Sequence, residues 1–228
     1  MFKLKGMMFF ALVIMLMACS CAKPDASGLL VFKNVRVFDG ERTHMQVTVV
    51  VENGRIKHIG ADLRIPAGAH VIEGEGQTLL PGMIDSHVHI GPGGLRRALM
   101  FGVTTELCMA NDPEKVATLK QEQLEGGAQD RADFFHAGWA ATSPGGHGTQ
   151  FNPSPSKPTI DRAEDADAFV KSRVDEGSDY IKIIYPGGSS EIRPGWMPQI
   201  TEPTMRAVVA AAHRCLLHNK SYDRAGCI

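Results

Sequence analysis

The stretch PGMIDSHVHI, residues Pro81 to Ile90, places two histidines one residue apart in an otherwise apolar run. Side chains of a β-strand alternate between two faces, so Asp85, His87 and His89 are predicted to share one face. In a buried strand each of these polar groups needs a partner, because an unpaired one costs stability. A metal ion would satisfy two imidazoles presented as His-x-His. The alternative is a hydrogen-bonded pair of core histidines, but the run bounded by Pro and Gly favours a metal site.

The composition of the whole chain sets broad limits on its class. The chain has 228 residues, 43% of them hydrophobic, and a formal net charge of −1. This is enough to bury a sizeable core, in one large domain or two modest ones. Because the charge is balanced, we expect no nucleic-acid partner.

The first eighteen residues have the pattern of a secretory signal. Lys3 and Lys5 precede an uncharged run, Met7 to Ala18, that is short for a transmembrane helix. The sequence therefore predicts a signal peptide over residues 1–18 and export from the cytoplasm.

The end of that segment, LMAC at Leu16 to Cys19, resembles a bacterial lipobox. The resemblance implies that Cys19 becomes the lipid-modified first residue, followed by a linker over residues 19–28. Ser20 is typical of an outer-membrane destination, so we expect a chain anchored to the bacterial envelope and facing the periplasm. An ordinary signal peptide cut nearby is the alternative.

From residue 29 the pattern is that of short β-strands. The runs LLVFKNVRVFDG, QVTVVVENGRIKHIGA and AHVIEGEGQTLLPG are rich in β-formers, and Asn53-Gly54 is a strong hairpin signal. We predict a small β-rich module over residues 29–81.

After residue 81 the pattern changes to alternating strands and helices. Strands are predicted at 84–90, 103–109, 134–140 and 179–185, and helices at 94–101, 113–126, 163–177 and 202–214. Such alternation indicates an α/β fold with a parallel sheet, either doubly wound or a (β/α) barrel, over residues 82–228.

Several motifs in order resemble the amidohydrolase superfamily, near its imidazolonepropionase-like and Xaa-Pro dipeptidase-like members. They are NVRVFDG, LPGMIDSHVHI, GVTT, PGGHGTQF and GSDYIKIIY, within residues 29–214. The resemblance implies a β-rich module followed by the first half of a (β/α)8 TIM-type barrel. It also implies a metal-dependent hydrolase that cleaves carbon–nitrogen bonds of amides, cyclic amides or dipeptides.

The same resemblance implies roles for particular residues. His87 and His89 match metal ligands. Asp85 lies deeper in the strand and is interpreted either as a group that orients a ligand imidazole or as a structural residue. Lys182 matches a lysine that is carbamylated and bridges two metal ions, although a lysine whose ammonium group reaches water is the bland alternative. Burial would also lower the pKa of such a lysine. One or two Zn²⁺ ions are expected, with manganese as an alternative.

The proposed chemistry is metal-assisted hydrolysis of a small molecule or dipeptide, with His147 as a substrate contact. The family's general-base aspartate and two further histidines have no match, and the tail after Arg214 stops resembling the family. The sequence therefore predicts a barrel truncated after its fourth strand, with a frameshift as one origin. A non-catalytic lipoprotein fragment or binding module, able to self-associate, is the alternative function.

Overall fold

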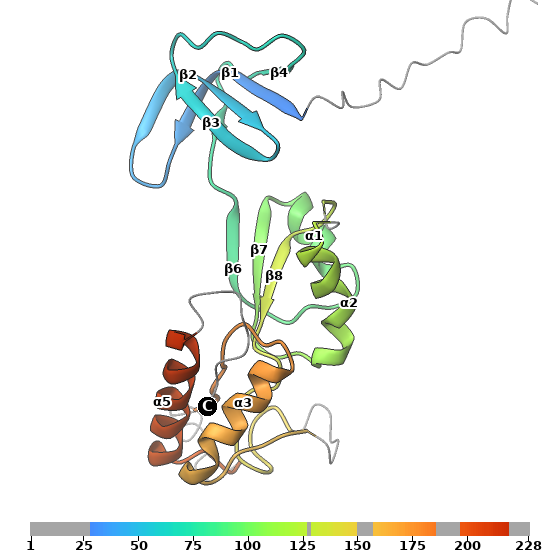
Figure 1. Ribbon diagram of the computed structural model, residues 1–228, viewed down its shortest axis with the longest axis vertical. Coiled ribbons are helices and arrows are strands. Elements are labelled where there is room, and N and C mark those ends of the chain that lie inside the picture. The colour runs from blue at the N-terminus through green and yellow to red at the C-terminus, as the bar shows by residue number, and fades with distance from the viewer. Residues whose placement is uncertain (1–27, 127–128, 150–156, 186–196, 219–228) are drawn as a thin grey trace, which may run out of the picture. The chain divides into compact units, whose positions relative to one another are not determined.

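The computed structural model describes residues 28–126, 129–149, 157–185 and 197–218, and its chain divides into two compact units, Met1–Pro81 and Gly82–Ile228 (Figure 1). The signal segment and Cys19 lie outside the described residues, so their roles remain predictions.

The first unit is a five-stranded sheet. Its strands are β1 (Leu29–Phe38), β2 (Thr43–Glu52), β3 (Arg55–Gly60), β4 (His70–Glu73) and β5 (Thr78–Leu79). The order is β3-β2-β1-β4, with β5 also paired to β1. The antiparallel β2–β3 hairpin turns at Asn53 and Gly54, both with positive φ, which confirms the predicted turn. Alternate valines of β1 and β2 form its core: Val35, Val37, Val47 and Val49.

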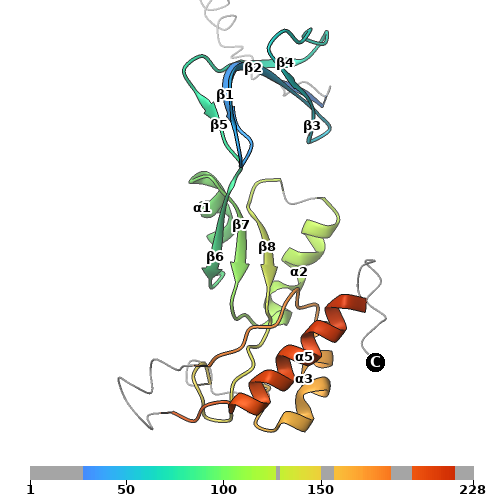
Figure 2. The ribbon, with the colours of Figure 1, turned by 90° about the vertical axis from the view of Figure 1, so that its left-hand side faces the viewer.

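The second unit begins with a three-stranded parallel sheet. Its strands are β6 (Met83–Val88), β7 (Val103–Cys108) and β8 (Asp133–His136), in the order β6-β7-β8. The connecting helices α1 (Gly94–Met100) and α2 (Pro113–Leu124) lie along one face of this sheet (Figures 1 and 2). Leu95, Val116 and Phe134 form the buried core between helices and strands. These elements confirm the predicted strand–helix alternation.

The remainder of the second unit is a helical layer. A 3-10 turn at Ala163–Asp165 leads into α3 (Ala166–Asp175), and α5 spans Glu202–His218. The two helices pack together through a core that includes Phe169, Val170 and Val208. Helices were predicted at both places.

The expected strand at 179–185 is a correction. Within the described chain this segment makes one isolated parallel bridge, between Ala141 and Ile183, rather than a ladder. The Ala141 amide donates to the Lys182 carbonyl at 2.7 Å, and the Ile184 amide donates to the Ala141 carbonyl at 2.9 Å. A strand requires consecutive pairs, and β8 has already ended at His136, so only one residue of the preceding segment is in register.

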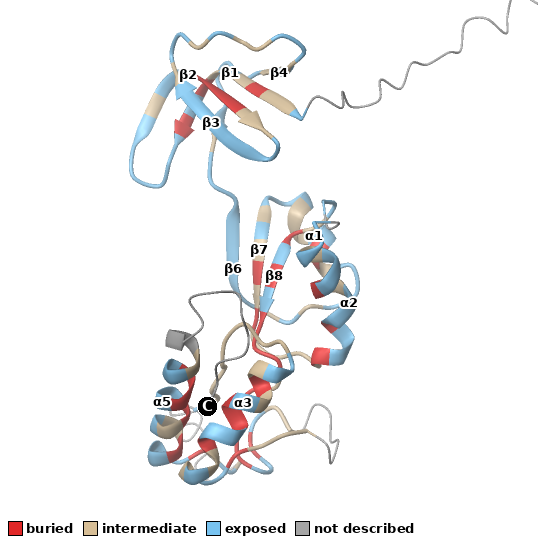
Figure 3. Ribbon diagram, in the orientation of Figure 1, coloured by how far each residue is buried: buried red, intermediate tan, exposed pale blue. Residues whose placement is uncertain are grey.

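The burial of β6 is a second correction. The strand was predicted to be buried, but Met83 to His87 are all exposed and Val88 is half-buried (Figure 3). The physical reason is its position, since β6 is an edge strand of the described sheet and pairs with β7 alone.

Candidate functional site

A cavity of about 810 Å³ lies where β6, β7 and β8 end. Its wall comes from the ends of these three strands, the segments that follow them, and the segment around Lys182. His87, His89, His147 and Lys182 all line it, although 95 positions separate the first from the last in sequence. Parallel strands bring their carboxyl ends to one edge, which explains how distant segments meet there.

His87 of β6 and His89, which directly follows β6, line this cavity close to one another. The ring centroids of His87 and His89 are 6.2 Å apart, with planes at 70°. The Nδ1 atom of His89 lies 3.1 Å from the Ala110 carbonyl oxygen. Because a carbonyl only accepts, Nδ1 must carry the proton, which leaves the lone pair of the neutral ring on Nε2. The backbone after β7 thus fixes His89 in a tautomer suited to ligation through Nε2.

Asp85 does not line the cavity with the two histidines. Asp85 pairs with Glu106 and Val88 pairs with Cys108. Between these two pairs, β6 advances by three residues and β7 by two, so β6 contains one extra residue. This extra residue breaks the period-two alternation on which the sequence prediction relied. Asp85 therefore lies beside Glu106, and its carboxylate accepts the His87 backbone amide at 3.2 Å rather than an imidazole. The expected orienting role belongs to the Ala110 carbonyl instead.

A carboxylate pair results from this register. Glu106 is buried, and burial followed by repulsion from Asp85 raises the pKa of the Glu106 carboxyl. Neither carboxylate lines the cavity. The pair therefore belongs to the packing of the sheet rather than to the candidate site.

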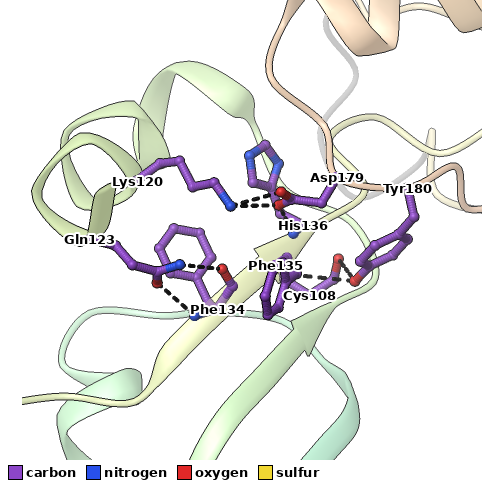
Figure 4. Close-up of polar contacts among 8 residues, drawn as sticks. All are labelled: Cys108, Lys120, Gln123, Phe134, Phe135, His136, Asp179 and Tyr180. Carbon is purple, nitrogen blue, oxygen red and sulfur yellow. Dashed lines mark hydrogen bonds and ion pairs between the residues drawn. The ribbon is translucent and has the colours of Figure 1, made fainter. Parts of the chain in front are cut away.

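Lys182 is half-buried and lines the cavity, close to Ala141 on the backbone. Two residues just before it fasten its segment to the strand ends (Figure 4). The Lys120 ammonium donates to both oxygens of the Asp179 carboxylate, each at 2.8 Å. The same carboxylate accepts a hydrogen bond from the His136 backbone amide at 2.9 Å. The Asp179 amide in turn donates to the His136 carbonyl at 2.8 Å. This double connection holds the segment that carries Lys182 against the end of β8.

Tyr180 provides a second fastening. Its hydroxyl donates to the Cys108 carbonyl at 2.8 Å and lies 3.4 Å from the Phe135 carbonyl. Burial raises the pKa of the Tyr180 phenol, so the group stays protonated and remains a donor. Asp179 and Tyr180 are thus positioning residues for Lys182. The sequence did not reveal this role, because ordinary polar residues at the start of a predicted strand give no signal of their own.

His147 lies in the loop that follows β8, and it lines the same cavity as predicted for a loop overhanging the strand ends. Its carbonyl accepts the Thr142 hydroxyl at 3.0 Å, which closes the start of the loop. The role of His147 as a substrate contact stays a prediction.

Two lining residues, Trp139 and Lys157, were not anticipated. The Lys157 ammonium lies 4.9 Å from the Trp139 ring centroid and donates to the Gly148 carbonyl at 2.6 Å. A single lysine in a loop rich in proline and serine carries no distinguishing pattern, so only the folded structure brings it to the site.

The metal-ligating groups can now be counted within the described chain. No group of three or more His, Cys, Asp or Glu side chains there could hold a metal ion. Of the predicted metal ligands, the cavity brings together the two imidazoles of His87 and His89 and the amine of Lys182. The fixed tautomer of His89 fits a metal ligand, and a carbamylated lysine would add oxygen ligands to the two nitrogens.

Across the residues that the structure describes, none of the helices combines the length and apolarity needed to cross a bilayer.

The architecture of this unit is that of an α/β protein whose parallel strands lead into a shared cavity. Solved structures agree on the fold. The chain matches a putative prolidase from Bifidobacterium longum with TM-score 0.66 and 24% identity, over 82% of this chain and 47% of that one. An amidohydrolase structure matches with TM-score 0.65 and 23% identity, over 81% of this chain and 54% of that one.

Curated sequences add a closer local match. A dihydroorotase from Trichlorobacter lovleyi is 40% identical over 93 residues, which is 36% of this chain and 22% of that protein. An imidazolonepropionase from Vibrio cholerae is 43% identical over 49 residues, covering 22% of this chain and 12% of that protein. No family model matches the chain. Together with the ordered motifs, these matches show that the chain is similar to proteins named as amidohydrolases and their relatives.

The chain spans only part of these proteins. It covers about a fifth of the length of the first curated relatives and about half of the solved structures. The activity, substrate and partners of the whole proteins are therefore matters for proposal.

Proposed function

We propose that this chain carries part of a metal-dependent hydrolase that acts on carbon–nitrogen bonds, in the first half of a (β/α)8 barrel. Relatives named dihydroorotase, imidazolonepropionase and prolidase support this reaction type at the level of the superfamily. The observation that carries the proposal is the convergence of His87, His89 and Lys182 on one cavity at the strand ends.

These three residues would hold one or two divalent ions, Zn²⁺ or a similar metal, with Lys182 carbamylated. Such an ion supplies Lewis acidity, which lowers the pKa of water and polarises a scissile carbonyl. The chain's own contribution is placement. The Ala110 carbonyl fixes the proton of His89 on Nδ1, and the Asp179 and Tyr180 contacts hold the Lys182 segment.

The substrate would bind in the same cavity as a small amide, cyclic amide or dipeptide, with His147 in contact with it. Proton transfer requires a general base. Among the described lining residues the one carboxylate is Asp112, which caps α2 by accepting the Glu114 amide at 3.2 Å. Asp112 is therefore committed to the helix start, and no base is assigned within this part of the chain.

Metal content tests the proposal directly. The full chain, incubated with Zn²⁺ and bicarbonate and then desalted, should retain at least about one equivalent of zinc by mass spectrometry. His87→Ala and His89→Ala should each reduce retention by about tenfold or more, because a two-imidazole site loses half its nitrogen ligands. His58→Ala, an exposed histidine of the first unit, is the matched control. Retention unchanged in both cavity variants would refute the site.

Lys182 has its own readout. Carbon-13 NMR with labelled bicarbonate should show a carbamate resonance in the wild-type chain that Lys182→Arg removes. Hydrolysis of amide or dipeptide substrates by the wild type but not by His87→Ala would support catalysis.

The second candidate is a non-catalytic binding module that self-associates. It is favoured by exposed apolar side chains at the β6 edge and the end of α1, with Ile84 64% and Phe101 77% exposed. Exposed apolar surface of this kind is characteristic of interaction sites. Sedimentation of the full chain tests it: a monomer at all concentrations, together with amide hydrolysis, would reject this candidate.

We also propose export and lipid anchoring through Cys19 to the outer membrane, facing the periplasm. The proposal is supported by the resemblance of Leu16 to Cys19 to a lipobox. Replacing Cys19 by Ser should move the chain from the membrane fraction to the soluble fraction of a bacterial lysate, and persistence in the membrane would contradict it.

A further inference from the structure

The cavity wall contains a lysine whose charge the proposed reaction does not use. Lys157 is half-buried, and its ammonium donates to the Gly148 carbonyl at 2.6 Å. An ammonium has three donors, and no carboxylate of the described residues forms a salt bridge with it. Burial lowers the pKa of Lys157, with no charged neighbour among the causes. Its charge is therefore placed in a partly desolvated site without a compensating anion in this part of the chain.

The other charges on the wall leave Lys157 as the free cation. The charged lining residues of the described chain are Asp112, Lys115, Lys157 and Lys182. Lys115 is a largely exposed side chain 3.9 Å from the Asp112 carboxylate, so these two charges compensate one another. Carbamylation would convert Lys182 from a cation to an anion. Under the proposed function, Lys157 is thus the side-chain cation of the described cavity wall that remains uncompensated.

The surroundings of Lys157 are apolar and aromatic. Its ammonium lies over Trp139, 4.9 Å from the ring centroid. Ala140, Ile183 and Ile184 line the same cavity. A cation beside an aromatic face and aliphatic side chains suits an anionic group attached to an apolar one.

We propose that Lys157 binds a carboxylate of the substrate and that Trp139 packs against the apolar group next to it, so that these two residues select a substrate with a free carboxylate over its uncharged amide. This inference rests on the proposed function for the reaction. The binding step itself involves Lys157 and Trp139 and needs no metal.

A pair of probes tests the inference. N-acetyl-leucine carries a free carboxylate, and N-acetyl-leucinamide has an uncharged amide in its place. Both are titrated into the full chain after chelation of metal and removal of bicarbonate, so that a carboxylate cannot bind through an ion. The indole resonances report binding, and Trp139→Phe assigns the signal of Trp139.

The wild-type chain should bind the carboxylate probe about tenfold more tightly than the amide probe, as a charge-assisted hydrogen bond in a partly buried site would give. Lys157→Met should remove that preference and leave amide binding unchanged. Lys157→Arg should restore most of it, which separates loss of charge from loss of fold. Lys115→Met, the matched lysine paired with Asp112, should keep the preference.

Equal binding of the two probes by the wild type, or no binding of either, would overturn the inference. A loss of preference in Lys115→Met equal to that in Lys157→Met would also overturn it, because the effect would then be one of general charge. Zinc retention, measured on separate samples of the same chain loaded with Zn²⁺ and bicarbonate, separates the two failures. Retained zinc with no carboxylate preference rejects this inference alone, whereas lost zinc with an intact preference rejects the metal site alone.

Discussion

β6 and β8 flank the same middle strand, yet their surroundings differ sharply. In β8, Phe134 is fully buried and His136 nearly so, whereas in β6 the side chain of Ile84 is 64% exposed (Figure 3). Both strands pair in parallel with β7. Pairing alone therefore does not bury a strand; coverage of its faces does.

The coverage of β8 comes from specific contacts (Figure 4). The Gln123 side chain of α2 bonds both backbone groups of Phe134, accepting its amide at 2.8 Å and donating to its carbonyl at 3.2 Å. Asp179 binds both backbone groups of His136. The pairing of β6 is instead interrupted by register shifts.

This difference bears on the candidate site. The segment carrying Lys182 is fastened to the well-covered strand β8, while His87 lies in the poorly covered strand β6 and His89 directly follows it. We infer that the lysine side of the site is the more stable, and that ordering of β6 is the step most sensitive to ligands, metal or a partner.

The largest expected effect separates the two strands directly. Phe134→Ala should lower the free energy of unfolding of the second unit by about 4 kcal/mol, because it leaves a cavity in the core beside Leu95 and Val116. Ile84→Ala, on exposed β6, should change it by less than about 0.5 kcal/mol. Both tryptophans lie beyond residue 81, so their fluorescence in urea reports this unit alone. Comparable losses in the two variants would contradict the comparison.

The next effect concerns the fastening of the Lys182 segment. Asp179→Ala should lower the free energy of unfolding by about 3 kcal/mol, because it leaves the Lys120 ammonium buried without its partner. The double variant Lys120→Met/Asp179→Ala should recover part of that loss, since no unpaired charge remains. Urea titrations of the single and double variants measure both. If the loss of unfolding free energy in the double variant equals the sum of the losses in Lys120→Met and Asp179→Ala, the two residues do not interact.

The smallest effect tests the register of β6 against β7. The pKa of Glu106 is higher in the folded chain than its ordinary value of 4.5. Ionisation of this carboxyl therefore lowers the free energy of unfolding as the pH rises above 4.5, whereas the protonated carboxyl carries no such cost. Glu106→Gln should therefore be more stable than the wild type at pH 7, by on the order of 1 kcal/mol.

That advantage should shrink as the pH falls toward 4.5, the ordinary pKa of the group. Thermal unfolding between pH 4 and pH 8 measures it, with Asp133→Asn, at an exposed position of β8, as the control. A difference that does not vary with pH would argue against the Asp85–Glu106 contact.

Much of the architecture could be predicted because local periodicity carries it. The Asn-Gly turn, helices α1 and α2, and strands β7 and β8 follow from turn chemistry and from apolar spacing. The placement of Asp85 could not be predicted, since the shift between Asp85 and Val88 depends on how β7 pairs with β6. Residues 179–185 read as a strand for their apolar pattern, but a strand requires a neighbour in register.

The sequence by itself determined the alternation of strands and helices, the likeness to amidohydrolases, and the choice of His87, His89, Lys182 and His147 as site residues. These depend on residue type and short spacing, which the chain displays directly. Only the tertiary structure decided that Ala110 orients His89, that Asp179 and Tyr180 hold the lysine segment, and that Lys157 enters the cavity. Each of these depends on contacts between residues distant in sequence, which no local pattern encodes.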